Sequence, residues 1–327
     1  MNTTLDFSYI PNLIIDSAMI AMLVSLFISY LTLPFYFYVH NLKKHKEKNL
    51  PIVKFFYKAV KLSYFVFIVL AIVLFFCISR ESNSTKAHLG IQNDENLMKI
   101  VAVFTLFLIY ILHILQQTFH LLLFSLAIMS YLKYQFPYDF LYSQNYISKY
   151  VRNFNVFFVL KDFVCSAILV LHFEKLLGNE LMNITSGFYL VLYIAVNMFI
   201  CLLTPFINIS IITGMKKNRH LHSQQHIYIQ KYMFIQSIMV LFFKIITVTI
   251  SIPIFFDEGS VLFVSSMSIV DFMAMPLVIQ LSYLRCNLNE LYNLFTSFNC
   301  CKFLKIVFGR VDATVHPILP HVAFSIT

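Results

Sequence analysis

Charged side chains are scarce in this chain: Asp, Glu, Lys and Arg together make up 12% of its 327 residues. Soluble globular chains carry roughly 25% charged and 45–50% apolar residues, whereas 59% of this chain is apolar. The shortage of charge excludes a soluble two-domain enzyme, and the high apolar content excludes a disordered chain. The composition favours a protein that has the lipid bilayer as its solvent.

Motifs for catalysis and metal binding are also missing. The sequence contains no HExxH, GxSxG or GxxxxGK pattern, and glycine occurs only 6 times. The 6 Cys residues form neither a CxxC pair with metal spacing nor the dense set of a disulfide scaffold. We therefore expect no enzymatic activity, no cofactor and no metal site.

Long apolar runs dominate the rest of the sequence. A run of about 20 apolar residues can cross the hydrocarbon as a helix. Such runs occupy residues 13–39, 55–79, 97–131, 154–173, 185–215, 227–256 and 260–284. They predict an all-α membrane protein with a seven-transmembrane helix bundle over residues 13–284. Residues 1–12 are expected to be an extracellular N-terminus rather than a cleaved signal peptide, and residues 285–327 a cytoplasmic tail.

Basic residues in the loops predict the orientation of this bundle. With the N-terminus outside, eleven Lys and Arg residues fall in cytoplasmic loops and three on the other side, as expected for loops retained in the cytoplasm. The net charge of +9 is explained in this way without a nucleic-acid partner. Glycosylation sequons at Asn2, Asn83 and Asn183 all fall in segments placed outside, whereas the sequon at Asn208 lies within the fifth span.

Two ionisable residues interrupt the sixth and seventh spans at similar depth, Lys244 and Asp271. Because a charge in hydrocarbon costs several kcal/mol, each one suggests a function. We expect the two side chains to face the interior and to pair. Two roles are open: an ion pair that fixes the register of the helices, and a lock that ligand binding loosens.

The third span carries a polar stripe in an otherwise apolar segment. The offsets of His113, Gln116, Gln117 and His120 are 0, 3, 4 and 7, which place all four on one helical face. Lipid would leave their polar atoms unsatisfied, so we expect the stripe to point into the bundle. It could serve as a hydrogen-bonded seam between helices, or contact a ligand at its outermost member, His113.

The stretch after the seventh span predicts a short amphipathic helix along the membrane. Its apolar stripe consists of Leu288, Leu291, Tyr292, Phe295 and Phe298. Cys300 and Cys301 follow at the membrane edge and are predicted palmitoylation sites. A basic patch at the same face would bind anionic lipid or an intracellular partner; it comprises Lys43, Lys44, Lys46, Lys48, Lys54, Lys58 and Lys61.

Three stretches carry a resemblance to a known family: LPFYFYVHNLKKHKEKNLPIVKFFYK, HLLLFSLAIMSYLKYQFP and VDFMAMPLVIQLSYLRCN. Over roughly residues 30–290, the chain resembles the nematode serpentine receptor class Z chemoreceptors, which are seven-helix G-protein-coupled receptors. The resemblance implies a small environmental ligand outside, a heterotrimeric G protein inside, and a place in the plasma membrane of a sensory neuron, at its cilium. The acidic-Arg-Tyr triplet of rhodopsin-like receptors is replaced by Met129, Ser130 and Tyr131.

On this basis we expect an outward-facing pocket between spans three, five, six and seven. Its candidate ligand-binding residues are Tyr110, His113, Asn197, Lys244 and Asp271. The residues expected to face a G protein are Ser130, Tyr131, Lys133, Pro137, Lys216, Lys217, Arg219 and Lys231. Two other functions remain open: a cation channel of the insect olfactory receptor type, with its N-terminus inside, and a small-solute transporter.

Overall fold

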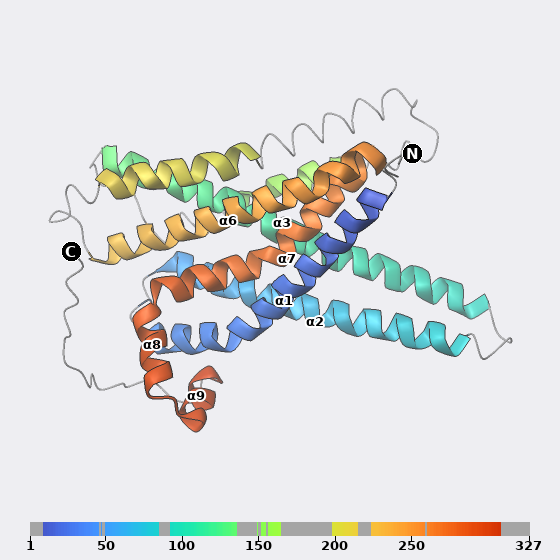
Figure 1. Ribbon diagram of the computed structural model, residues 1–327, viewed down its shortest axis with the longest axis horizontal. Coiled ribbons are helices and arrows are strands. Elements are labelled where there is room, and N and C mark those ends of the chain that lie inside the picture. The colour runs from blue at the N-terminus through green and yellow to red at the C-terminus, as the bar shows by residue number, and fades with distance from the viewer. Residues whose placement is uncertain are drawn as a thin grey trace, which may run out of the picture.

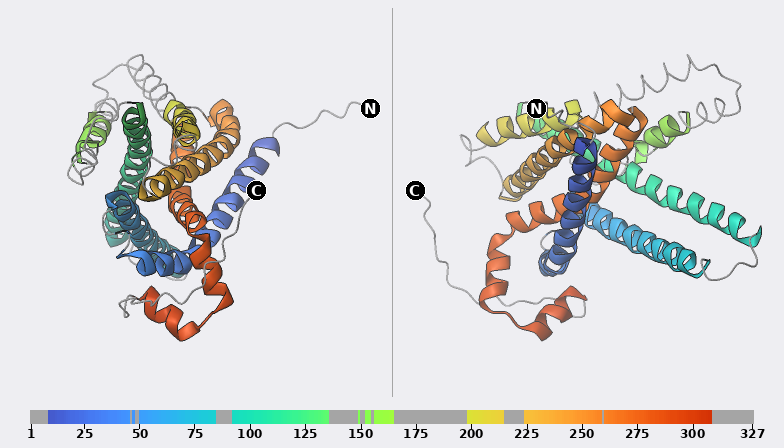
Figure 2. Two further views of the ribbon diagram at one scale, coloured as in Figure 1. Left: turned by 90° about the vertical axis from the view of Figure 1, so that its left-hand side faces the viewer. Right: turned by 45° about the vertical axis from the view of Figure 1, so that its right-hand side comes forward.

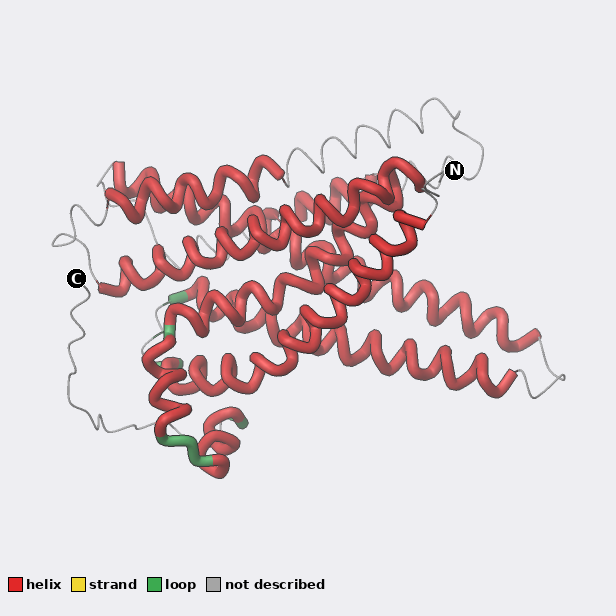
Figure 3. Tube along the Cα trace, in the orientation of Figure 1, coloured by secondary structure: helices red, strands yellow, loops and turns green. Residues whose placement is uncertain are grey.

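The computed structural model describes residues 9–45, 47, 50–84, 92–135, 149, 152–154, 156–164, 198–214, 224–258 and 260–308. Helices account for nearly all of this part of the chain, and no strand occurs in it (Figure 3). The prediction of an all-α membrane protein is therefore confirmed. Half of the predicted fourth span and the first part of the fifth lie outside the described residues.

Five helices are long and apolar enough to cross a membrane. They are α1 (Tyr9–Lys43), α2 (Pro51–Ser84), α3 (Gln92–Gln135), α6 (Gln224–Glu258) and α7 (Ser260–Cys286). A shorter apolar helix, Met198–Gly214, and a helical segment over 156–164 lie beside them. The long helices run alternately up and down the bundle, so that α1 and α7 end, and α2 and α6 begin, near α8 (Figure 1). This is called the α8 end of the bundle below.

Large apolar side chains cover the outside of the bundle. Phe27 on α1, Phe75 on α2 and Phe107 on α3 are each more than half exposed, together with many Leu, Ile and Val residues. A surface of this extent would be unfavourable in water but matches lipid hydrocarbon. The distribution of exposed side chains therefore agrees with a multi-pass membrane protein.

Helix α7 lies in the centre of the described bundle. In the most apolar stretch of α7, 72% of the residues are buried, compared with 11% in the corresponding stretch of α3. It packs most extensively against α6 and α1, and also contacts α2 and α3 (Figure 2). Side chains on α7 can therefore connect elements that do not touch one another.

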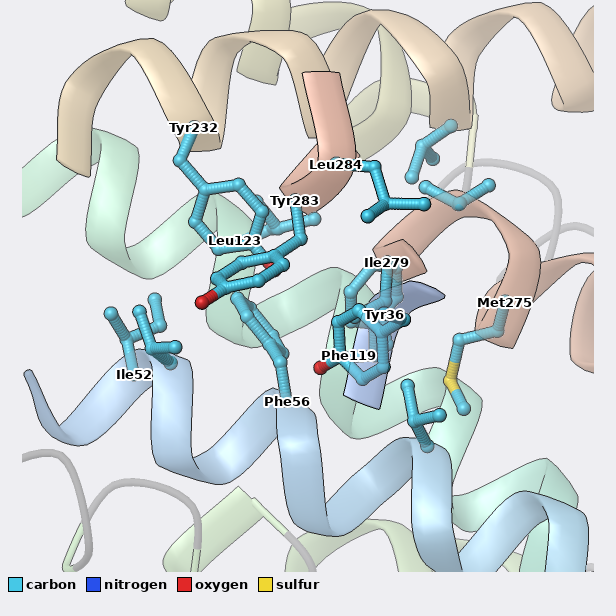
Figure 4. Close-up of a cluster of buried hydrophobic side chains, with 14 of the residues drawn as sticks. Tyr36, Ile52, Phe56, Phe119, Leu123, Tyr232, Met275, Ile279, Tyr283 and Leu284 are labelled. Carbon is cyan, nitrogen blue, oxygen red and sulfur yellow. The ribbon is translucent and has the colours of Figure 1, made fainter. Parts of the chain in front are cut away.

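An aromatic core joins the five long helices near the α8 end. It contains Tyr36 from α1, Phe56 from α2, Phe119 from α3, Tyr232 from α6 and Tyr283 from α7, all almost completely buried (Figure 4). The ring centroids of Tyr36 and Tyr283 lie 5.2 Å apart, and those of Phe56 and Phe119 lie 5.5 Å apart, with steep angles between the rings. Such edge-to-face pairs contribute about 0.5–1.5 kcal/mol each. Packing of this kind matters in lipid, where burying apolar surface brings little gain.

The segment after α7 forms two helices, where the sequence predicted one. Helix α8 spans Leu288–Thr296 and α9 spans Cys300–Val307. The break arises because the Asn299 side chain caps α9, accepting a hydrogen bond from the backbone N–H of Lys302 at 3.1 Å. Helix α9 packs on α1, where Asn41 donates to the carbonyl oxygen of Ile306 at 2.9 Å.

The predicted apolar stripe of the first of these helices is turned mainly outward. Leu288, Tyr292, Phe295 and Phe298 are exposed and Leu291 is partly buried, whereas Leu294 packs inward. Outward-facing apolar side chains beside a membrane span are suited to the lipid interface.

Candidate functional site

An ion pair lies inside the membrane-spanning part of the bundle, between α6 and α7. Lys244 is 1% exposed and Asp271 is 7% exposed. The Lys244 Nζ atom donates a hydrogen bond to Asp271 Oδ2, and Gln116 on α3 donates to the same oxygen at 3.0 Å. The pairing expected from the sequence is thus confirmed, and three helices meet at one carboxylate.

Two further polar atoms lie near this pair without a hydrogen-bond partner in the described part of the chain. They are Gln116 Oε1 and His120 Nε2, and both side chains are buried. On its other ring nitrogen, His120 contacts the Cys201 sulfur at 3.9 Å. An unsatisfied buried polar atom costs about 1–3 kcal/mol, which a water molecule or a ligand group can offset. These atoms can therefore accept or donate hydrogen bonds to a bound molecule.

A second group of charges lies on the other side of the α3 stripe. Lys161 and Asp162, which interrupt the fourth predicted span, form an ion pair at 3.0 Å. Lys161 Nζ also donates to Gln117 Oε1 at 3.3 Å, and His113 Nε2 lies 3.9 Å from Asp162 Oδ2. His113 and Gln117 contact each other through their side chains. Adjacent glutamines of α3 therefore reach two different ion pairs.

The predicted ligand-binding residues fall into two neighbouring groups. Lys244 and Asp271 form the pair described above, whereas His113 faces the Lys161–Asp162 group. Tyr110 is partly buried and close enough to Asp162 for electrostatic interaction. Asn197 lies outside the described residues. The structure thus adds Lys161 and Asp162 to the set suggested by the sequence.

Few of the residues expected to face a G protein are described. Ser130 is buried, whereas Tyr131 on α3 and Lys231 on α6 are exposed, all in the half of the bundle toward the α8 end. Lys133 lies in α3, but its side chain is outside the description, and Pro137, Lys216, Lys217 and Arg219 lie outside the described residues altogether.

The predicted modification sites are placed in part. Cys300 and Cys301 are exposed at the start of α9. Asn83 lies in the last turn of α2 without a described side chain, and Asn2 and Asn183 lie outside the described residues. Asn208, whose sequon falls in the fifth span, is completely buried and donates to Ser237 Oγ at 3.2 Å. It is therefore inaccessible to glycosylation.

A hydrogen-bonded junction at the α8 end was not expected from the sequence. Glu47, between α1 and α2, accepts hydrogen bonds from the Tyr228 hydroxyl at 3.0 Å and the Tyr283 hydroxyl at 2.8 Å. Asn287 donates to the Tyr228 oxygen at 2.9 Å and accepts from Lys43 Nζ at 2.6 Å. These five residues are called the Glu47 junction below, and they connect α1, α6 and α7 to the start of α8.

Glu47 is 5% exposed although it belongs to a loop. Burial raises the pKa of Glu47 above its ordinary value of 4.5, while the hydrogen bonds from Tyr283 and Tyr228 and the charge of Lys43 act in the opposite direction. The surrounding sequence, HNLKKHKEKN, is rich in polar residues and is typical of an exposed loop. Only the single acidic residue among the lysines could have drawn attention to this position.

A second unexpected junction joins α1, α2 and α7. Gln280 on α7 is fully buried, accepts from the Thr32 hydroxyl at 2.6 Å and donates to the Tyr64 oxygen at 2.7 Å. Tyr64 also forms a hydrogen bond with Ser29. The amide of Gln280 is satisfied on both sides, as expected for a structural contact. A polar residue in an apolar span was the signal available in the sequence.

Helices with a lipid-facing surface and ionisable side chains turned inward define a multi-pass membrane protein. Within the described residues, no group of three His, Cys, Asp or Glu side chains is arranged to hold a metal ion. The family model described as serpentine type 7TM GPCR chemoreceptor Srz matches residues 19–288, and the chain belongs to this family. The resemblance found in the sequence is thereby confirmed, and the family is one of receptors. Searches of curated proteins and of solved structures gave no match.

Proposed function

We propose that the protein is a chemosensory receptor that binds a small environmental ligand between its helices and activates a heterotrimeric G protein. The observation that supports this proposal most strongly is the Lys244–Asp271 pair, with Gln116 bound to the same carboxylate. Charges inside the membrane are costly and are commonly retained for a function. The neighbouring atoms without partners would accept the polar group of a ligand.

Binding at this site would act by competition for the ion pair. A ligand that bonds to Lys244 or to Asp271 weakens their mutual attraction, and it favours whichever arrangement of α6 and α7 it binds better. The Lys161–Asp162 group, near Tyr110 and His113, would bind a second polar part of the ligand. Asn197 would complete the site from the fifth span.

The α8 end would be cytoplasmic and the N-terminus extracellular. The G-protein-facing surface would include Ser130, Tyr131, Lys133, Pro137, Lys216, Lys217, Arg219 and Lys231. Glycans would be attached at Asn2, Asn83 and Asn183, and acyl chains at Cys300 and Cys301. The protein would reside in the plasma membrane of a sensory neuron, at its cilium.

Ligand screening tests the site. Cells that carry the receptor and a promiscuous G protein would be exposed to odorant and metabolite libraries. We expect the active compound to lose at least about tenfold in potency, or 1.4 kcal/mol, in the Lys244→Met/Asp271→Asn double variant. This variant removes both charges together and so avoids an unpaired one. Lys305→Met, which changes an exposed lysine of α9, should respond like the wild type. Equal potency in the double variant would contradict the site.

Mapping of the termini tests the class of protein. An epitope tag at Met1 should be detected on intact cells, and a tag at Thr327 only after permeabilisation. A channel of the insect olfactory receptor type would place the first tag inside. Net uptake of solute by reconstituted vesicles would instead indicate a transporter.

A further inference from the structure

The Glu47 junction is positioned by a loop whose backbone is itself fixed. The Glu47 N–H donates to the carbonyl oxygen of Lys43 at 2.9 Å, and the Glu47 carbonyl oxygen accepts from Leu50 at 2.9 Å. These two bonds anchor the residue to the end of α1 and to the start of α2. The carboxylate therefore sits on a defined support, from which it reaches α6 and α7.

The first turns of α6 depend on this junction for their polar contacts. Within residues 227–235, Tyr228 makes all the side-chain hydrogen bonds that reach other elements in the described part of the chain. Gln230 Oε1 and the Tyr232 hydroxyl are buried and have no hydrogen-bond partner among the described residues. Tyr232 contributes aromatic packing against Phe56 and Tyr283 instead.

The chemistry of the junction allows its hydrogen bonds to open and close reversibly. A hydrogen bond to an ionised acceptor is roughly twice as strong as one between neutral groups. Burying the carboxylate, however, removes it from water, and opening the junction would restore that hydration. The two effects oppose each other, so closed and open arrangements can lie close in free energy.

We propose that the Glu47 junction is the release point of α6: the loop carboxylate holds the α8 end of α6 against α7, and α6 separates from α7 when Tyr228 leaves it. In the signalling sense this rests on the proposed function, because an opened α8 end would expose the surface that a G protein binds. The restraint on α6 is a separate physical claim and can be measured without any G protein.

Cys286 provides a reporter of separation. It is partly buried at the end of α7, packs against the cluster of buried apolar side chains, and lies close enough to Tyr228 and Lys231 for electrostatic interaction. The purified full-length receptor in lipid nanodiscs would be treated with a membrane-impermeant maleimide. Mass spectrometry would then give the labelling rate at each cysteine. Cys201, buried beside the Lys244–Asp271 pair, serves as the internal control for general unfolding.

Removal of the acceptor should open the junction. Each of Glu47→Ala and Tyr228→Phe removes at least the Tyr228–Glu47 hydrogen bond. We expect each to raise the labelling rate of Cys286 by at least about fivefold, the factor that corresponds to one hydrogen bond, with Cys201 still protected. Glu47→Gln, which keeps a hydrogen-bonding side chain of the same size, should stay within about twofold of the wild type. Asn289→Ala removes an exposed polar side chain of α8 outside the junction, and it should have no effect.

An unchanged Cys286 rate in both Glu47→Ala and Tyr228→Phe would overturn the proposal. So would an equal rise at Cys201, because it would indicate general loosening rather than release of α6. Nucleotide exchange on purified heterotrimeric G proteins, measured on the same samples, separates the two claims. Faster labelling without faster exchange would support the restraint on α6 and count against the proposed receptor function.

Discussion

Polar contacts join helices α6 and α7 at two depths, and the two contacts differ in chemistry. The Lys244–Asp271 pair joins two opposite charges that are both buried within the membrane-spanning part. The Glu47 junction uses one buried negative charge and the neutral hydroxyls of Tyr228 and Tyr283. Sixteen residues of α6 separate Tyr228 from Lys244, which corresponds to roughly 24 Å along the helix.

This difference in chemistry indicates how much free energy is needed to break each contact. Removing one partner of a buried ion pair leaves a charge that lipid and apolar side chains cannot solvate. Removing one hydroxyl from the Glu47 junction leaves a carboxylate near the aqueous boundary, where water can replace it. The pair is therefore a strict contact that favours one arrangement, whereas the junction can open at modest cost.

The largest effect is expected from breaking the ion pair on one side. Lys244→Met leaves Asp271 buried without its counter-charge and should destabilise the receptor by about 3–5 kcal/mol. Thermal unfolding in detergent micelles and the amount of protein at the cell surface measure this effect. The Lys244→Met/Asp271→Asn double variant should recover most of the loss. If both variants were equally unstable, the lysine would matter for packing rather than charge.

A smaller loss is expected when the acceptor of the Glu47 junction is removed. Glu47→Ala should destabilise the protein by about 1–3 kcal/mol, because the hydroxyls of Tyr228 and Tyr283 lose their acceptor. Glu47→Gln should cost less than half as much in the same thermal assay. A loss of stability as large as that of Lys244→Met would contradict the claim that the ion pair is the stronger of the two contacts.

The next prediction concerns pH and follows from the raised pKa of Glu47. For a carboxyl group whose pKa is raised by folding, the favourable contribution is present below the ordinary value of 4.5 and is lost as pH rises through the raised pKa. The stability of the wild type relative to Glu47→Gln should therefore fall as the pH rises from 4.5 through the raised pKa of Glu47. The charged and titratable groups that face Glu47 remain in both proteins: Tyr36, His40, Lys43, Tyr228, Tyr232, Tyr283 and Cys286. A pH-independent difference in unfolding temperature would contradict the burial of an ionisable Glu47.

The smallest effect is the coupling between the two sites. Sites this far apart usually have additive effects on stability, within about 0.3–0.5 kcal/mol. Combining Glu47→Ala with the Lys244→Met/Asp271→Asn variant measures the departure from additivity. We expect the loss of stability in the combined variant to exceed the sum of the separate losses by more than about 0.5 kcal/mol, because α6 and α7 would be released together. Strictly additive losses of stability would mean that the two contacts act independently.

Sequence patterns predicted the parts of this molecule that depend on contrast with an apolar background. Lys244 and Asp271 stand out in apolar spans, and the helical offsets of the α3 stripe indicate its inward face. Gln116 and His120 are indeed buried there. The same contrast applies to Gln280, which was overlooked although it lies in the apolar seventh span.

The remainder depended on tertiary structure. Glu47 belongs to a polar loop, and nothing local indicates that the ends of α1, α6 and α7 enclose it. Lys161 and Asp162 lie within the fourth predicted span, and their role became apparent only from their contacts with Gln117 and His113. The break between α8 and α9 follows from a capping interaction of Asn299, which a hydrophobic pattern does not encode.

Ligand-independent nucleotide exchange is the most direct test of a receptor controlled at α6. The full-length wild type, Glu47→Ala and Glu47→Gln would be reconstituted in nanodiscs with a panel of purified heterotrimeric G proteins. We predict faster exchange with Glu47→Ala than with the wild type on at least one G protein, and an almost unchanged rate with Glu47→Gln. Identical rates for all three proteins, although Cys286 is exposed in Glu47→Ala, would contradict the account.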